Sequence, residues 1–140
     1  MTRHPGDKSS FKCWTSVPLR YSDTDALGHV NNAVFSTLLE QGRVATFFDG
    51  MDALSGVGKT FVIASMKLDF LAEMNFPGTA EIGTKINSFG RSSVKIAQVI
   101  YLNEKCCAVS DEVMVLIDET TRKPTLIDDA TRKLIELRFQ

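Results

Sequence analysis

The feature that most constrains this chain is one long apolar helical pattern, at about residues 32–49, with strand-like segments before and after it. Glycine at position 42 lowers helix stability by about 1 kcal/mol relative to alanine, so we expect a strand backbone to approach Gly42 closely. Glu40 and Arg43, three residues apart on the more polar side, are expected to form an ion pair. Because apolar residues cover most of the circumference, the helix should be enclosed by the rest of the protein. One arc of the helical wheel gathers Val34, Phe35, Leu38, Leu39, Gly42 and Ala45.

Period-two alternation after the helix predicts four strands joined by short turns, at residues 60–70, 79–88, 93–102 and 106–118. In the first of these strands the even-numbered positions are expected to share one face: Val62, Ala64, Met66, Leu68 and Phe70. A fifth strand is expected before the helix, at residues 11–21, with Pro18 near a sheet edge or a bulge. Residues 126–137 should form a short closing helix, with Asp128 or Asp129 as its cap.

Short turns make consecutive strands antiparallel neighbours. The fold class is therefore α+β, with a five-stranded antiparallel sheet and one buried helix. The length of 140 residues fits one domain. We expect residues 1–10 to be a flexible tail and residues 11–140 to be the folded domain.

Charge and composition exclude several classes of function. A net charge of −1 argues against a nucleic-acid-binding protein, which normally carries a basic excess. No apolar run approaches the roughly 20 residues of a membrane helix, and the polar start lacks a signal sequence, so we expect a cytoplasmic protein. The three cysteines, Cys13, Cys106 and Cys107, are odd in number, and no Cys or His cluster has the spacing of a zinc site. Neither a disulfide nor a metal is expected.

The residues best suited to chemistry lie between the first strand and the helix. Asp25 and His29 are four residues apart in a turn, Gly28 supplies backbone freedom, and Asn31 and Asn32 can cap the helix. The N–H groups and the positive dipole end of that helix point back at the same turn. Taken singly, these residues are typical of turns and helix caps. Together, a carboxylate, an imidazole and fixed N–H donors favour a site that attacks a carbonyl group.

The string Asp-Thr-Asp-Ala-Leu-Gly-His-Val-Asn-Asn at residues 23–32 resembles the signature of the 4-hydroxybenzoyl-CoA thioesterase-like hotdog family. Phe35 and the Leu-Glu-Gln-Gly-Arg string at residues 39–43 continue the resemblance. The Asn-Phe-Pro-Gly turn at residues 75–78 and the Gly-Arg-Ser-Ser hairpin at residues 90–93 follow in the family's order, so it spans nearly the whole chain.

The resemblance implies a hotdog fold, in which a curved five-stranded antiparallel sheet wraps a long central helix. It also implies that subunits join their sheets edge to edge, giving a homodimer or homotetramer with sites at the subunit interface. The alternative is another one-helix curved-sheet fold, of the cystatin or nuclear-transport-factor kind. Those folds usually place the helix earlier and lack the motif around Asp25.

The function implied by the resemblance is that of an acyl-CoA thioesterase, which hydrolyses an acyl thioester to a carboxylic acid and a free thiol. Coenzyme A would be part of the substrate and not a cofactor, and an acyl-carrier-protein substrate stays open. Asp25 would act as nucleophile or general base, and the backbone N–H of Asn32 would polarise the carbonyl. His29 matches a His of plant acyl-carrier-protein thioesterases, whose motif has Asn where this chain has Leu27.

Five residues are expected to bind the substrate: Asn31, Ser65, Lys67, Arg91 and Ser92. The resemblance turns Ser65 and Lys67 toward the pantetheine arm and places Arg91 near the phosphates of coenzyme A, which need basic partners. Ser92 stands where relatives carry a basic residue. Other cations are therefore alternative phosphate partners: Lys59, Lys95 and Arg122.

Two other functions fit the same fold. A hotdog protein can bind an acyl thioester as a non-catalytic sensor, although this chain has no added helix-turn-helix segment. A dehydratase acting on acyl thioesters would need a positioned His and a carboxylate on the helix. The sequence does not fix the acyl specificity.

Overall fold

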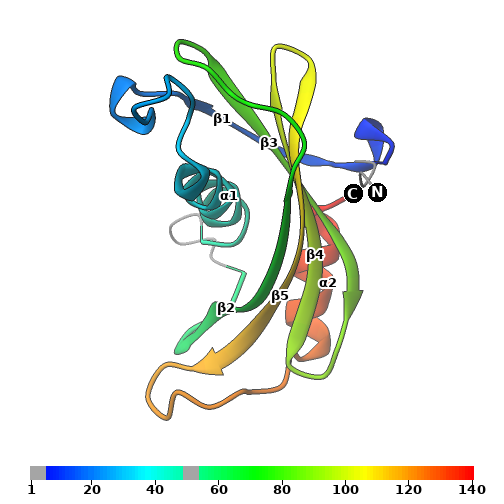
Figure 1. The fold of residues 1–140 in the computed structure, drawn as a ribbon. Helices are drawn as coiled ribbons and strands as arrows, with labels where there is room; N and C mark the ends of the chain where they lie inside the picture. The colour runs from blue at the N-terminus through cyan, green and yellow to red at the C-terminus, as the bar shows by residue number, and fades with distance from the viewer. Residues whose placement is uncertain (1–5, 49–53) are drawn as a thin grey trace.

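The computed structural model describes residues 6–48 and 54–140, and its elements follow the predicted order (Figure 1). The strands are β1 (Cys13–Pro18), β2 (Lys59–Phe70), β3 (Thr79–Phe89), β4 (Ser93–Leu102) and β5 (Lys105–Asp118). The helices are α1 (Asn32–Phe47) and α2 (Asp129–Arg138), and two 3-10 turns are η1 (Lys8–Ser10) and η2 (Tyr21–Asp23). The predicted long helix is confirmed as far as Phe47, and position 49 lies outside the described residues.

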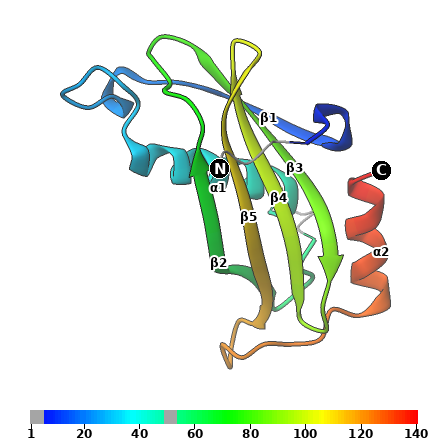
Figure 2. The ribbon, with the colours of Figure 1, turned by 45° about the vertical axis from the view of Figure 1, so that its right-hand side comes forward.

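All five strands form one antiparallel sheet in the order β1-β3-β4-β5-β2. Strands β1 and β2 are therefore its edges, and Pro18 ends the edge strand β1, as predicted. The sheet curves around α1, which lies on its concave side (Figure 1). Helix α2 lies beside the end of β3, where the Arg132 guanidinium covers the Phe89 ring (Figure 2). The Asp128 side chain caps α2 by accepting a hydrogen bond from the Thr131 N–H, which confirms the predicted cap.

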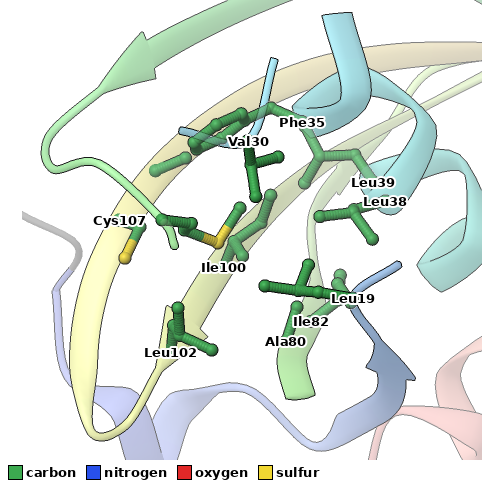
Figure 3. Packing of buried hydrophobic residues seen from close by; sticks show 12 residues of the cluster. Leu19, Val30, Phe35, Leu38, Leu39, Ala80, Ile82, Ile100, Leu102 and Cys107 are labelled. Carbon is green, nitrogen blue, oxygen red and sulfur yellow. The ribbon is translucent and has the colours of Figure 1, made fainter. Parts of the chain in front are cut away.

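The main core lies between α1 and the concave face of the sheet. Phe35, Leu38 and Leu39 on α1 point toward Ile82 of β3 and Ile100 of β4 (Figure 3). These side chains are at most 3% exposed, so each contributes roughly 1.5–3 kcal/mol of apolar burial. The opposite face of α1 is exposed in the single chain, at Glu40, Gln41 and Val44 among others.

Strand β2 departs from the predicted alternation. Its register with β5 shifts between Ile63 and Ser65, which is the mark of a β-bulge. Before the bulge Phe61 is the buried side chain, whereas after it Met66 packs against the core. The single face predicted for positions 62–70 is therefore wrong before the bulge, because one extra residue moves every following side chain to the opposite face.

Gly42 lies where α1 packs closely against side chains of the sheet. A methyl group there would stand 2.6 Å from Ile82 Cγ2 and 2.9 Å from Gln98 Nε2. The predicted close approach is thus confirmed, but strand side chains make it and not a strand backbone.

We expect Gly42→Ala to lower the free energy of unfolding by about 1–3 kcal/mol, because the overpacking outweighs the gain of about 1 kcal/mol in helix propensity. Urea unfolding measures the change, with Gln41→Ala as the control, since Gln41 is an exposed neighbour on the same helix. A Gly42→Ala variant as stable as the wild type would contradict this packing.

The ion pair that the sequence predicted between Glu40 and Arg43 is wrong. The Arg43 side chain is buried, and its Nη1 donates to Glu112 of β5 and to Gln98 Oε1 of β4, the latter at 3.3 Å. The Gln98 amide in turn donates to the Leu39 carbonyl at 3.1 Å and to Thr84 Oγ1 at 2.9 Å. A buried polar network therefore ties the middle of α1 to three strands.

The network makes stability depend on pH. Burial raises the pKa of Glu112 from 4.5 to about 7, against the opposing effect of the Arg43 charge. A carboxyl group whose pKa is higher in the folded than in the unfolded state stabilises the fold fully at pH values below the unfolded-state pKa. That contribution is lost as the pH rises through the folded-state pKa. We expect the unfolding free energy of the wild type to fall, relative to Glu112→Gln, between about pH 4.5 and about pH 7. If urea unfolding gives the same dependence of the unfolding free energy on pH for the wild type and for Glu112→Gln, this expectation is contradicted.

The predicted flexible tail, residues 1–10, contains the 3-10 turn η1 at Lys8–Ser10. Lys8, in η1, lies 4.6 Å from the centre of the Tyr101 ring and 5.4 Å from that of Trp14, and it pairs with Glu104 at 3.4 Å. Residues 1–5 are outside the described part. Neither helix in the described part of the chain has the length and apolar character needed to cross a membrane.

Candidate active site

The loop between β1 and α1 is anchored by Asp23. Its buried carboxylate accepts hydrogen bonds from the Arg20 N–H at 2.8 Å and from Arg20 Nε and Nη2 at 3.1 and 2.8 Å. Burial acts to raise the pKa of Asp23, but the hydrogen bonds and charge of Arg20 outweigh it and hold the pKa below its usual value. The Asp23 carbonyl also accepts from the Asn31 N–H at 2.9 Å. Asp23 therefore shapes the loop.

Asp25 and His29 close a tight turn within that loop. The Asp25 N–H donates to the His29 carbonyl at 2.8 Å, and the Gly28 N–H donates back to the Asp25 carbonyl at 3.1 Å. Gly28 has a φ of +85°, which a residue with a side chain rarely adopts. One carboxylate oxygen of Asp25, Oδ1, accepts from the Leu27 N–H at 2.9 Å. The second oxygen, Oδ2, makes no hydrogen bond to any described residue.

The start of α1 leaves one backbone donor unused. The Asn31 side chain caps the helix by accepting from the Ala33 N–H at 2.9 Å, and the Asn31 carbonyl accepts from the Val34 N–H at 2.8 Å. Within the described residues the Asn32 N–H has no acceptor. Because the helix dipole places partial positive charge at this end, the Asn32 N–H is suited to hold an oxygen that gains negative charge.

A cavity of about 430 Å³ brings these groups together. Its second wall is the end of β2 and the segment after it, which is held beside the loop by a 2.8 Å hydrogen bond from the Val30 N–H to the Met74 carbonyl. On this wall Glu73 Oε2 lies 3.1 Å from His29 Nε2. The lining residues are Asp25, Leu27, His29, Val30, Asn31, Asn32, Phe35, Phe70, Leu71, Ala72 and Glu73.

Sequence reasoning missed Glu73. It lies more than forty residues beyond His29, in an irregular segment with no periodic pattern. Only the pairing of β2 with β5, and the tie between Val30 and Met74, bring it to the cavity.

The other predicted substrate-binding residues lie elsewhere in the single chain. Ser65 and Lys67 point away from the core side of β2 and, with Lys95, line a separate open hollow of about 490 Å³. Arg91 and Ser92 form the turn between β3 and β4, where their carbonyls accept from Ile127 and Leu116. Neither turn residue lines the cavity of Asp25, and the same is true of two alternative phosphate partners, Lys59 and Arg122.

Across residues 6–48 and 54–140, no three His, Cys, Asp or Glu side chains gather in a way that could hold a metal ion.

Comparisons with known proteins agree with this architecture. The family model of the thioesterase-like superfamily matches residues 19–135. A thioesterase from Thermus thermophilus, solved with coenzyme A and Zn, is 29% identical and superposes with a TM-score of 0.82 over 93% of this chain and 96% of that chain. A predicted thioesterase from Bacillus stearothermophilus is 27% identical, with a TM-score of 0.79 over 89% of this chain and 94% of its own. The uncharacterized protein YsmA of Bacillus subtilis (strain 168) is 27% identical over 133 residues, which are 91% of this chain and 88% of that protein. The stretch matched by the family model contains the Asp25 turn, α1 and strands β2 to β5.

Proposed function

The chain belongs to the thioesterase-like superfamily, and from that premise we propose that it hydrolyses an acyl-coenzyme A to a carboxylic acid and free coenzyme A. The observation that carries the proposal is the shared cavity at the start of α1, which Asp25 and Asn32 both line and where the Asn32 N–H has no acceptor among the described residues. Coenzyme A would be part of the substrate. The relative from Thermus thermophilus, which was solved with coenzyme A, supports this class of ligand.

Thioester hydrolysis needs a negatively charged group near the carbonyl carbon and a hydrogen-bond donor that stabilises the charge on the carbonyl oxygen. With the thioester carbonyl oxygen on the Asn32 N–H, the carbonyl carbon becomes more electrophilic, and the helix dipole stabilises the oxyanion. Asp25 Oδ2 then either attacks that carbon or takes a proton from an attacking water molecule. Both routes require an ionised Asp25. The hydrogen bond from the Leu27 N–H to Oδ1 fixes the carboxylate without consuming Oδ2.

A second copy of the chain completes the proposed site. Strand β2 is an edge strand of 12 residues whose outer side pairs with no strand among the described residues, and Ile63 and Phe70 on it are 43% and 49% exposed. Such an edge invites pairing, and most homo-oligomers pair about a two-fold axis. Because Phe70 at the end of β2 also lines the cavity, a copy paired along β2 would stand beside the site.

This arrangement gives the remaining substrate residues a role. Ser65, Lys67, Arg91 and Ser92 would contact the coenzyme A arm of a thioester bound beside them, including one held by the neighbouring subunit. Asn31 would act by holding the helix start in place.

Light scattering at micromolar concentration should give at least twice the chain mass of 15.5 kDa, as a homodimer or homotetramer. A mass of one chain would contradict this assembly.

Release of thiol from short, long and aromatic acyl-CoAs tests the function. We expect turnover on at least part of the panel, with equal amounts of thiol and acid. Flat traces together with tight acyl-CoA binding would instead identify a sensor. A dehydratase is less well supported, because the carboxylate of α1, Glu40, does not line the cavity.

A further inference from the structure

Helix α1 and strand β2 run alongside each other in opposite directions. Near one end the Phe35 and Phe70 rings, which both line the cavity of Asp25, have their centres 5.1 Å apart. Next to them Ser36 Oγ lies 4.0 Å from Met66 Sδ. Further along, the two elements border an open hollow of about 230 Å³. The contact between Ser36 and Met66 lies between the two spaces, so within one chain the hollow is separate from the cavity.

The hollow contains a buried guanidinium group with unused donors. Arg43 lines it and is only 7% exposed, and Arg43 Nη1 is engaged with Glu112 and Gln98. Nε and Nη2 of Arg43 make no hydrogen bond to any described residue, yet neither is sealed from solvent. Glu40 is the other polar residue of the lining. The rest of the lining is apolar: Val44, Phe48, Phe61, Ile63 and Met114.

These groups favour a ligand that carries a hydroxyl group. An N–H group in apolar surroundings is costly to leave unpaired, so an oxygen that accepts from Arg43 gains affinity. The Glu40 carboxylate only accepts hydrogen bonds, so it favours a group that also donates and repels a second negative charge. Pairing with Glu112 already offsets the charge of Arg43. A hydroxyl satisfies both side chains, whereas an alkyl end satisfies neither and a carboxylate is repelled by Glu40.

The hollow lies on the surface that the proposed pairing of two chains would cover. Val44 and Ile63, on its rim, are each 43% exposed. In an antiparallel pairing of two β2 edges about a two-fold axis, the Phe70 end of one strand lies toward the Lys59 end of the other. Phe70 lines the cavity, and Phe61, near the opposite end, lines the hollow. The cavity of one subunit therefore faces the hollow of its partner.

We propose, on the basis of the thioesterase function above, that the preferred substrate carries a hydroxyl group at the far end of its acyl chain, bound between the partner's Arg43 and the partner's Glu40. The thioester lies at Asp25 of one subunit, and the acyl chain crosses into the hollow of the other. The guanidinium donates from Nε or Nη2 to the hydroxyl oxygen, and the hydroxyl donates to the carboxylate. Arg43 and Glu40 are thus specificity-determining residues.

Thiol release from alkanoyl-CoAs and their ω-hydroxy analogues, matched in number of carbon atoms, tests the proposal. At the best chain length the wild type should favour the hydroxy analogue by at least about tenfold in kcat/KM, as expected for a hydrogen bond to a charged group. The ω-carboxy analogue should be the poorest of the three. In Arg43→Lys the ammonium group can still pair with Glu112 but leaves no donor for the hollow, so the preference should fall to about twofold or less.

Glu40→Gln tests the second contact. Its amide oxygen can still accept from the hydroxyl, so most of the hydroxyl preference should remain. Its loss of charge should raise kcat/KM for the ω-carboxy analogue by roughly fivefold or more. Glu104→Gln is the control with wild-type ratios, since Glu104 is exposed and pairs with Lys8 on another part of the molecule.

Mixed assemblies of Asp25→Asn and Arg43→Lys chains, purified through two different tags, identify the subunit that supplies the hollow. In a mixed pair the intact Asp25 belongs to the Arg43→Lys chain, and it faces the intact Arg43 of the other chain. The wild-type preference for the hydroxy analogue should therefore return. Activity without that preference would show that each chain uses its own hollow, and would overturn the crossing between subunits.

The same assays separate the ways in which the proposal can fail. No thiol release from any acyl-CoA would remove the thioesterase function and the hydroxyl site with it. Thiol release with equal kcat/KM for both members of every pair would overturn the hydroxyl site alone. If melting shows that Arg43→Lys is unfolded, Glu40→Gln still decides: unchanged rejection of the ω-carboxy analogue would contradict the position given to the hydroxyl.

Discussion

Replacing Asp25 with asparagine is expected to lower kcat on the best acyl-CoA by at least about a hundredfold, in line with the 10²–10⁴ associated with positioned proton transfer. Asparagine keeps the size of the side chain and an oxygen that can accept from the Leu27 N–H. It loses the negative charge that both routes through Asp25 require. The fold and the affinity for acyl-CoA should therefore stay nearly unchanged, as measured by melting temperature and by ligand binding.

Two neighbours serve as comparisons for Asp25→Asn. Asp23→Asn should affect kcat far less, because Asp23 is buried against Arg20 and shapes the loop. His29→Ala should fall between the two in steady-state turnover. If Asp25→Asn keeps wild-type turnover, or loses it only because it unfolds, then Asp25 is a structural residue.

Replacing Arg43 with methionine is expected to lower the free energy of unfolding by about 3–5 kcal/mol, the cost of breaking a buried ion pair by removing one partner. Methionine fills much of the space but leaves the Glu112 carboxyl and the Gln98 oxygen without their donor. Glu112 Oε2 is already buried without a hydrogen bond, so the loss of Arg43 would leave both carboxyl oxygens poorly paired. Urea unfolding above about pH 7, where the Glu112 carboxyl of the wild type is ionised, measures the loss.

A matched control and a second-site change make this test specific. Glu40→Gln should be nearly neutral, because Glu40 is exposed and is not the partner of Arg43. The double variant Arg43→Met with Glu112→Leu should regain most of the stability, since apolar replacement of both partners is often neutral or better. A cost below about 1 kcal/mol for Arg43→Met, or an equal cost for Glu40→Gln, would show that the pair is not what ties α1 to the sheet.

Most of the fold could be predicted because its signals are local. The 3.6-residue period of α1, the two-residue period of β3 and β4, and the cap at Asp128 all depend on neighbours within a few positions. The bulge in β2 could not be predicted, because it is set by the register against β5 and not by the residues of β2 themselves. The partner of Arg43 was missed for a similar reason. Glu112 is 69 residues away, whereas Glu40 is at the spacing that helix geometry favours.

The residues of the candidate site also differ in whether local sequence could predict them. Asp25, His29 and Asn32 lie within eight consecutive positions, so one turn and one helix start are enough to bring them to the same cavity. Glu73 reaches it only through the path of β2 and the segment that follows. Arg91, on the β3–β4 turn, is not brought to the cavity by this chain alone, and its predicted role depends on how subunits pair.

The most direct test of the thioesterase assignment is hydrolysis in water enriched in heavy oxygen, with mass analysis of both products. We expect free coenzyme A and an equal amount of carboxylic acid carrying one oxygen from solvent, with both nearly absent for Asp25→Asn. Recovery of the bound acyl-CoA unchanged, or of a thioester altered in its acyl chain with the C–S bond intact, would contradict the assignment of this chain as a thioesterase.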